Sequence, residues 1–404
     1  MFVTRTVNLL AVVAMALSLV VVPSPSPVLA DPVSDFDEAY GRWGGDWQRN
    51  DHNEIGLLAW GESYVMMGIA AMFRATGDAA YLDDLAYHAD GVLENTDAAR
   101  GVTDYRGESN LCWRNTSYQP NEEPYCWAVH TGMIAYPIAE YARLVRDAGL
   151  EATPAYDGST FGAKAIAYQS ALADVIAGHD DEFKPIGDAG AYFFQDDATF
   201  LGLAGQATPL NQGETMGRLL LTMWDLTGDA GYLDKGTRLV RRLHNALSTG
   251  PSGEYLWNYW GDPYAAPGED ISHAAISVGF ASLAAGYGIV IDEEDMEAFG
   301  STFMDSVYVD ADRFRNNVGG GGINGSAYKT QSARWLMLTA SRPSIYPAVL
   351  DYYAVTYPPS SIGSGSPLLG LAYLAEFEPA PCTDVAFVGS WTDDTGYWEP
   401  SGPD

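Results

Sequence analysis

The sequence predicts an all-α protein folded as an (α/α)6 toroid, a closed ring of helical hairpins. The first observation behind this prediction is an internal repeat, GESYVMMGIAAMFRATGDAAYLD at residues 61–83 and GETMGRLLLTMWDLTGDAGYLD at residues 213–234. In each copy an apolar helix is followed by Thr-Gly-Asp, in which glycine favours a left-handed helix end and aspartate caps the next helix. The second observation is that an all-apolar helix alternates with an amphipathic one, as expected of inner and outer layers. Strand signals are sparse, which argues against an α/β fold.

Further stretches extend the repeat into a ring of six hairpins. Four more segments are apolar nearly all round and are expected to be inner helices: residues 130–145, 272–286, 327–340 and 365–376. Outer partners are expected at residues 160–178, 293–305 and 344–356, and residues 35–49 supply the partner that closes the ring. The alternative is an open helical solenoid, in which the first and last hairpins do not meet.

The N-terminal segment has the features of a secretory signal peptide. An arginine precedes an apolar run at residues 7–22, and small residues end at Ala30. We therefore expect residues 1–30 to be removed and the mature protein to be secreted; an uncleaved membrane anchor is the alternative. Residues 31–378 are expected to form a toroid catalytic domain, followed by a C-terminal tail at 379–404. No later stretch is apolar for long enough to span a bilayer, so no membrane contact is expected after cleavage.

Composition excludes some classes of protein. Aspartate and glutamate number 53 against 21 lysines and arginines, which gives a net charge of −32 at pH 7. No basic stripe is present, so we expect no nucleic-acid partner. Cys112 and Cys126 flank a short loop and are expected to form a disulfide, which leaves Cys382 unpaired. Neither a CxxC pair nor an HExxH motif occurs, so we expect no metal site and no cofactor, although a calcium ion is compatible with the sequence.

Four long loops are expected to gather the functional residues. They occupy residues 96–129, 180–212, 248–271 and 311–326, and each precedes an inner helix. They should therefore converge on one face, around helix N-termini whose partial positive charge favours anions and polar sugars. Catalytic residues are expected among His130, Asn211, Gln212, Tyr259 and His273. Substrate-binding residues are expected among Trp60, Glu62, Arg114, Trp127, Glu214, Trp257, Trp260, Tyr264, Glu269, Asp270, Tyr328 and Lys329.

Each candidate also has a purely structural interpretation. Glu62 and Glu214 occupy equivalent repeat positions and would then be carboxylates of first helical turns. Asp270 would only cap a helix, and His130 and His273 would be core histidines. The aromatic run EYLWNYWGDPY at residues 254–264 would be core packing instead of a platform for sugar rings. The other histidines are expected at the surface or in loops: His52, His88, His179 and His244.

The repeated hairpins, with Gly-Glu, Thr-Gly-Asp and Tyr-Leu-Asp in matching places, resemble those of the (α/α) toroid enzymes of polysaccharide metabolism. That group includes uronate polysaccharide lyases, uronyl epimerases and inverting glycoside hydrolases. The resemblance covers residues 35–378 and implies an enzyme with a polysaccharide substrate. The hairpin motif is structural, so it does not choose between these reactions.

Among these reactions we expect β-elimination on a uronate-containing glycan. By resemblance, a lyase needs a group that neutralises the uronate carboxylate, a base for the adjacent C–H and an acid for the leaving oxygen. The expected neutralisers are Asn211, Gln212 and Arg114. The expected bases are His130 and His273, and the expected acid is Tyr259, with Tyr264 and Tyr328 as substitutes.

Two other functions stay open. An inverting glycoside hydrolase would use one protonated and one ionised carboxyl about 6.5–9.5 Å apart, drawn from Glu62, Glu214, Glu269 and Asp270. The acidic composition suits a neutral glycan better than a polyanion. A secreted glycan-binding protein would keep the aromatic residues but would lack an acid–base set around one sugar linkage. The sequence gives no indication of the oligomeric state.

Overall fold

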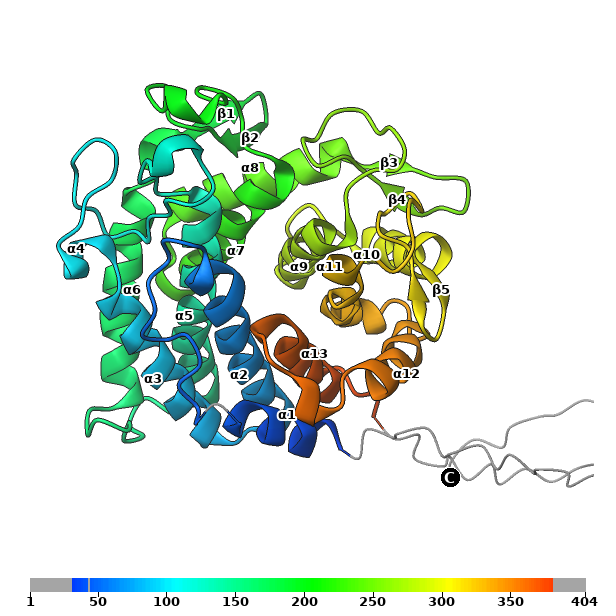
Figure 1. Cartoon of the computed structure of the whole chain (residues 1–404), viewed down its shortest axis with the longest axis horizontal. Helices are drawn as coiled ribbons and strands as arrows, with labels where there is room; N and C mark the ends of the chain where they lie inside the picture. Colours follow the sequence, from blue (N-terminus) through cyan, green and yellow to red (C-terminus); the bar gives the residue numbers. More distant parts are fainter. Residues whose placement is uncertain (1–30, 43, 381–404) are drawn as a thin grey trace, which may run out of the picture.

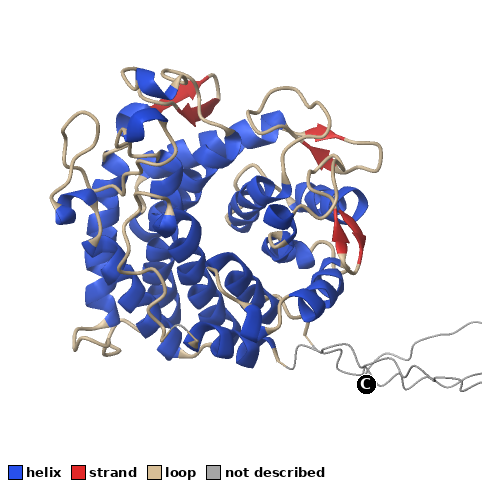
Figure 2. Ribbon diagram, in the orientation of Figure 1, coloured by secondary structure: helices blue, strands red, loops and turns tan. Residues whose placement is uncertain are grey.

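The computed structural model describes residues 31–42 and 44–380, which are mostly helical (Figure 1, Figure 2). The expected signal peptide, Cys382 and nearly all of the expected tail lie outside the described residues. The longer helices are α1 (Pro32–Gly41), α2 (Ser63–Thr76), α3 (Ala79–Glu94), α5 (Ala128–Ala148), α6 (Phe161–Ala177), α7 (Leu210–Thr227), α8 (Ala230–Ala246), α9 (Ile271–Gly286), α10 (Glu293–Ser301), α12 (Ile345–Thr356) and α13 (Gly365–Glu376). The short helical segments are η1 (Leu58–Glu62), α4 (Asp97–Arg100), η2 (Pro120–Glu122), η3 (Asp180–Glu182), η4 (Thr199–Leu201), η5 (Thr302–Val307), α11 (Ser326–Lys329), η6 (Ser332–Thr339) and η7 (Pro359–Ser361).

These helices form two concentric rings, as Figure 1 shows. The inner ring runs through α2, α5, α7, α9, the α11–η6 segment and α13, with each member in contact with the next. The outer helices α3, α6, α8, α10, α12 and α1 each contact an inner partner. Because α13 packs against α2, the ring closes. The predicted (α/α)6 toroid is confirmed, and the open solenoid is wrong.

The two repeated hairpins have the turn that their sequence predicts. Gly77 and Gly228 follow α2 and α7 with φ of 70° and 74°, a backbone conformation that residues with a Cβ rarely adopt. Asp78 and Asp229 then accept hydrogen bonds from the backbone N–H two residues further on, at 3.0 and 2.7 Å. Each aspartate satisfies an N–H that has no partner within its helix, so each outer helix begins where the repeat predicts.

Two helices differ from the prediction. The fifth inner helix, expected as one piece at residues 327–340, is broken between α11 and the 3-10 segment η6. The Tyr353 hydroxyl of α12 donates to the Thr330 carbonyl at 3.1 Å, which removes an acceptor that a continuous helix would use. The first outer helix ends at Gly41, not near residue 49, because Gly44 and Gly45 follow it with φ of 70° and 78°.

Three two-stranded antiparallel hairpins lie in the connections between helices (Figure 2). They are β1 (Phe183–Ile186) with β2 (Ala189–Tyr192), β3 (Ser248–Thr249) with β4 (Tyr255–Leu256), and β5 (Tyr308–Asp310) with β6 (Arg313–Phe314). In the longest pair, Phe183 lies opposite Tyr192. The described helices include none that is both long and apolar enough to cross a membrane.

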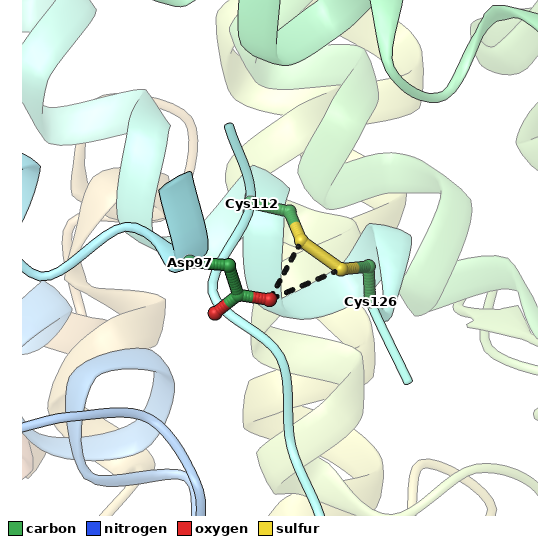
Figure 3. A group of neighbouring side chains, drawn as sticks. All are labelled: Asp97, Cys112 and Cys126. Atoms are coloured by element: carbon green, nitrogen blue, oxygen red, sulfur yellow. Dashed lines mark hydrogen bonds between the residues drawn. A yellow bond between two sulfur atoms is a disulfide. The ribbon is translucent and has the colours of Figure 1, made fainter. Parts of the chain in front are cut away.

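The loop between α4 and α5 is closed by a disulfide between Cys112 and Cys126 (Figure 3). This pairing confirms the prediction from the sequence. The Asp97 carboxylate lies against the bridge, with Oδ2 3.3 Å from the sulfur of Cys112 and 3.7 Å from that of Cys126. Burial raises the pKa of Asp97 to about 7, although a backbone hydrogen bond from Arg114 opposes the shift.

The centre of the ring is filled by side chains from the middle of the inner helices. Arg334 donates to the Tyr64 hydroxyl at 3.0 Å, and Arg218 lies between the sulfur atoms of Met67 and Met133 at 3.9 and 3.1 Å. Only a void of about 10 Å³ remains among these five residues and their neighbours. This plug separates two larger cavities, one at each end of the inner helices.

Candidate functional site

A cavity of about 350 Å³, here named the first cavity, opens where the inner helices begin. Its walls come from η1 and the first turns of α2, α9 and α13, together with the break between α11 and η6. Its lining residues are Trp60, Tyr64, Ser272, His273, Ile276, Thr330, Gln331, Ser364, Ser366 and Pro367. This is the face to which the sequence assigned the candidate residues.

An aspartate and a histidine in the first turn of α9 form an acid–base pair at this cavity. Asp270 caps α9, because its Oδ1 accepts from the backbone N–H groups of Ser272 at 3.0 Å and His273 at 3.2 Å. Its Oδ2 lies 2.6 Å from Nδ1 of His273. The other ring nitrogen, Nε2, has no hydrogen-bond partner among the described side chains and remains for a ligand.

The surroundings keep Asp270 ionised. Burial alone would raise the pKa of its carboxyl. The hydrogen bond and the positive charge of His273, together with the two backbone N–H groups, outweigh burial and lower that pKa. Asp270 therefore carries a negative charge at neutral pH, next to the ring of His273.

Tyr259 and Gln212 extend this pair. The ring of Tyr259 lies 5.0 Å from that of His273, and the Gln212 amide donates to the Tyr259 hydroxyl at 3.2 Å. Burial is the largest cause of a raised pKa at Tyr259, and Coulomb interactions with Glu269 and Asp270 add to it. The structure thus brings together four of the sequence-predicted residues: His273, Asp270, Tyr259 and Gln212.

Several cavity residues were missed in the sequence analysis. Ser364 and Ser366 lie where the sixth inner helix begins, and the Ser366 hydroxyl donates to the Gln331 side chain at 2.6 Å. A rule that every inner helix contributes its first turn would have found them. Trp60, which the sequence did predict as a binding residue, also lines the cavity, with Tyr64.

Two carboxyls lie behind the cavity, between α7 and α9. Glu269 is 2% exposed and accepts a hydrogen bond from the Trp257 indole, while its Oε1 has no partner. Burial, and then the nearby charge of Glu214, raise the pKa of Glu269 well above its usual value. Burial also raises the pKa of Glu214 to about 7, and neither of its oxygens has a partner with hydrogen-bond geometry. The neighbouring Ser277 hydroxyl offsets only part of that shift. The pKa of Glu269 is thus shifted upwards, in the opposite direction to that of Asp270.

Glu62 lies outside the cavity and is part of a buried network. One of its oxygens pairs with Nδ1 of His88, and the other accepts from the backbone N–H of Gln48 at 2.9 Å. The second ring nitrogen of His88 lies 2.9 Å from the Tyr40 hydroxyl. His88 is fully buried, so its expected place at the surface is wrong: it faces inward from α3 and holds Glu62. His179 is also buried, with Nε2 2.9 Å from the Thr131 hydroxyl, but it lies in the turn after α6, in keeping with an expected loop position.

His130 begins α5 but is sealed from solvent. It is 1% exposed, and its Nδ1 accepts from the Asn53 amide at 3.0 Å. The rings of Trp60 and Tyr118 meet it edge to face, with centroids 5.6 and 5.4 Å away. Burial lowers the pKa of His130 to about 3, so the imidazole stays neutral. Because His130 packs behind Trp60, it helps to hold this wall of the first cavity in place.

The other predicted residues lie around this centre. Arg114 pairs with Glu54 at 2.9 Å in the disulfide loop, and Asn211 is buried at the start of α7. Trp257 is fully buried against Phe299, so it belongs to the core and offers no surface to a sugar. Trp127 packs on Tyr125, and Trp260 is 39% exposed beside Tyr259. The remaining predicted binding residues are partly buried: Tyr264, Tyr328 and Lys329.

Comparison with known proteins gives similarity in structure but not in sequence. No family model and no curated protein matches the chain. The GH76A α-1,6-mannanase of Salegentibacter sp. HEL1_6 matches with a TM-score of 0.53 and 12% identity, over 86% of this chain and 99% of that one. An inactive variant of it, with two adjacent aspartates replaced by asparagine, matches equally well and is bound to α-1,6-mannotriose. A D-mannose isomerase matches with a TM-score of 0.51 and 11% identity, over 86% and 96% of the two chains.

These matches test two predictions made from the sequence. The resemblance to (α/α) toroid carbohydrate-active enzymes is confirmed at the level of the fold. The expectation of a uronate lyase is wrong, because the similar structures include those of α-1,6-mannanases, which are glycoside hydrolases. His273, Tyr259 and Gln212 do lie together, but a histidine beside a tyrosine and an amide is not specific to β-elimination.

Proposed function

We propose that this protein is an inverting glycoside hydrolase that acts on a neutral glycan, with an α-1,6-linked mannan as the first candidate. The fold supports an enzyme of this kind, since it extends over 99% of the α-1,6-mannanase chain. A net charge of −32 also favours a neutral substrate over a polyanion. The first cavity lies near the lower limit of small-molecule pockets, about 300–1,000 Å³, which suits one or two sugar units.

The observation that carries the proposal is that two adjacent carboxyls where α9 begins have pKa values shifted in opposite directions, upwards at Glu269 and downwards at Asp270. Hydrolysis with inversion needs one carboxylate to take a proton from water and one carboxylic acid to protonate the leaving oxygen. Asp270 has a lowered pKa and is oriented by His273, so it is the proposed base. Glu269 has a raised pKa and a buried Oε1 that lacks a hydrogen-bond partner, so it is the proposed acid. The inactive mannanase variant, with two adjacent aspartates replaced, supports a role for such a pair.

The proposal is tested by incubating the protein with α-1,6-mannan, other neutral glycans and uronate polymers while reducing ends and near-ultraviolet absorbance are followed. Reducing ends without absorbance on a neutral glycan are expected. Asp270→Asn should lower kcat by about 10²-fold or more, while asparagine still caps α9. Asp229→Asn makes the same change at an outer-helix cap and should leave kcat unaltered. Equal activity of the two variants would refute the role of Asp270.

One observation favours a second candidate, an aldose–ketose isomerase. His273 is the acid–base side chain that lines the first cavity directly, whereas both proposed carboxyls lie at its edge or behind it. An isomerase moves a proton between adjacent carbons of one sugar, which a single oriented imidazole can do. The D-mannose isomerase match is consistent with this reaction. Conversion of free mannose to a ketose, without cleavage of any glycan, would favour it over hydrolysis.

A further inference from the structure

The toroid has a second cavity of about 340 Å³ at the opposite end of its inner helices. Helix α9 reaches both cavities: Ser272 and His273 line the first, and Gly279, Ser282 and Gly286 line the second. From Ser272 to Gly286 the helix rises about 21 Å, at 1.5 Å per residue. The two cavities are therefore separate sites on opposite faces of the ring, divided by the plug of arginine, methionine and tyrosine side chains.

The second cavity is positively charged, although the protein as a whole is strongly acidic. Three arginines and two glutamates line it, which leaves one net positive charge. Two of these arginines are neutralised. Arg74 pairs with Glu376 at 2.6 Å and with Glu140 at 3.2 Å, and Arg143 pairs with Glu140 at 2.8 Å. Both glutamates that line the cavity are thus already held by an arginine.

The third arginine, Arg218, forms no ion pair with a carboxylate among the described residues, although its charge acts on Glu140 and Glu214 from a greater distance. Its guanidinium contacts the sulfur atoms of Met67 and Met133 and lies over the Tyr136 ring, 4.7 Å from the centroid. It is only 6% exposed, and its Nε is buried without an acceptor. Thioethers are weak acceptors, and a buried charge that lacks an anion is costly. Such a group in a cavity wall is suited to receive an anion from outside.

The remaining walls indicate what kind of anion would fit. Tyr136, Tyr287, Tyr373 and Phe377 supply ring faces and edges, and Ser282 supplies a hydroxyl. Aromatic walls around one unpaired guanidinium suit a ring-bearing molecule with a single acidic group.

We propose that the second cavity binds a small organic anion, of the size of one sugar ring and carrying a carboxylate or a phosphate, through Arg218. The site is independent of the first cavity and of the reaction proposed there. The bound anion would complete the hydrogen bonds of Arg218 and tie together α5, α7 and α9 at the end opposite the proposed active site.

Isothermal titration calorimetry at low ionic strength tests this proposal with mannose 6-phosphate, mannuronate, inorganic phosphate and mannose as probes. Saturable binding of at least one sugar anion is expected, tighter than that of phosphate, and none by mannose at the second site. The stronger of the two sugar anions identifies the acidic group. Arg218→Met, which suits the methionine surroundings, should weaken binding at least tenfold.

Two further variants keep the proposal falsifiable if Arg218→Met does not fold. Ser282→Phe fills the cavity without removing the guanidinium and should also abolish binding. Asp270→Asn alters only the first cavity and should leave anion binding unchanged. The proposal is overturned if neither sugar anion binds, if inorganic phosphate binds as tightly, if Ser282→Phe binds like the wild type, or if Asp270→Asn removes binding.

Discussion

Replacement of Glu214 by glutamine should change how the stability of the protein depends on pH. Burial raises the pKa of Glu214 from 4.5 to about 7 in the folded state. The folded protein therefore holds a proton on this carboxyl at pH values where the unfolded chain has lost it. The stability that this proton contributes is complete below pH 4.5 and is lost as the pH rises towards 7.

The size of the effect follows from the shift. A difference of 2.5 pKa units at about 1.36 kcal/mol each amounts to about 3 kcal/mol. Between pH 4.5 and 7 the wild type should lose about this much free energy of unfolding relative to Glu214→Gln. The comparison cancels the charge repulsion that every acidic group of the protein contributes, because both proteins share it.

Denaturant unfolding of both proteins at several pH values between 4.5 and 8 measures this difference. The informative quantity is how the difference in free energy of unfolding between the two proteins changes with pH. The absolute stability of the variant is less informative, because the glutamine amide makes its own contacts. A difference in free energy that stays constant across the range would refute the inference that Glu214 is buried as the neutral acid. A wild type that gains stability relative to the variant as the pH rises would contradict the sign.

Two other predictions concern the framework. Replacement of both Cys112 and Cys126 by serine opens a 15-residue loop and should lower the free energy of unfolding by about 3 kcal/mol. A reductant should lower the stability of the wild type to that of the variant and leave the variant unchanged. Equal stabilities of the two proteins under oxidising conditions would contradict this prediction. Gly132→Ala should lower the free energy of unfolding by about 1–3 kcal/mol, because its Cβ would lie 2.4 Å from the Thr215 carbonyl carbon where α5 crosses α7. Gly286→Ala, which meets nothing within 4 Å, is the matched control, and thermal unfolding that ranks the two glycine variants equally would show that this close approach is not needed.

Local rules gave most of the fold. The Thr-Gly-Asp turns depend on one left-handed glycine and one capping aspartate, and both act through neighbours in the sequence, so the hairpins were predictable. The apolar inner helices followed from their composition for the same reason. The break at Thr330 was not predictable, because it depends on the Tyr353 hydroxyl of another helix.

The candidate site was predicted less well. The cap and the histidine of α9 lie three residues apart, so the pair of Asp270 and His273 could be read from helical spacing. Burial could not be read in that way. Glu62 and Glu214 occupy equivalent repeat positions, yet one is paired with His88 and the other has no hydrogen-bond partner, because different outer helices cover them. Trp257 stands in a loop sequence rich in exposed residues but packs under Glu269.

The anomeric form of the first product is the most direct test of the proposal that this protein hydrolyses a glycan with inversion. The protein is mixed with an α-1,6-linked manno-oligosaccharide, and proton NMR spectra are recorded before the product equilibrates in water. An inverting hydrolase should release the new reducing end first as the β-anomer, because water attacks on the side opposite to the leaving oxygen. Initial release of the α-anomer, an unsaturated product, or conversion of mannose to a ketose without cleavage would contradict it.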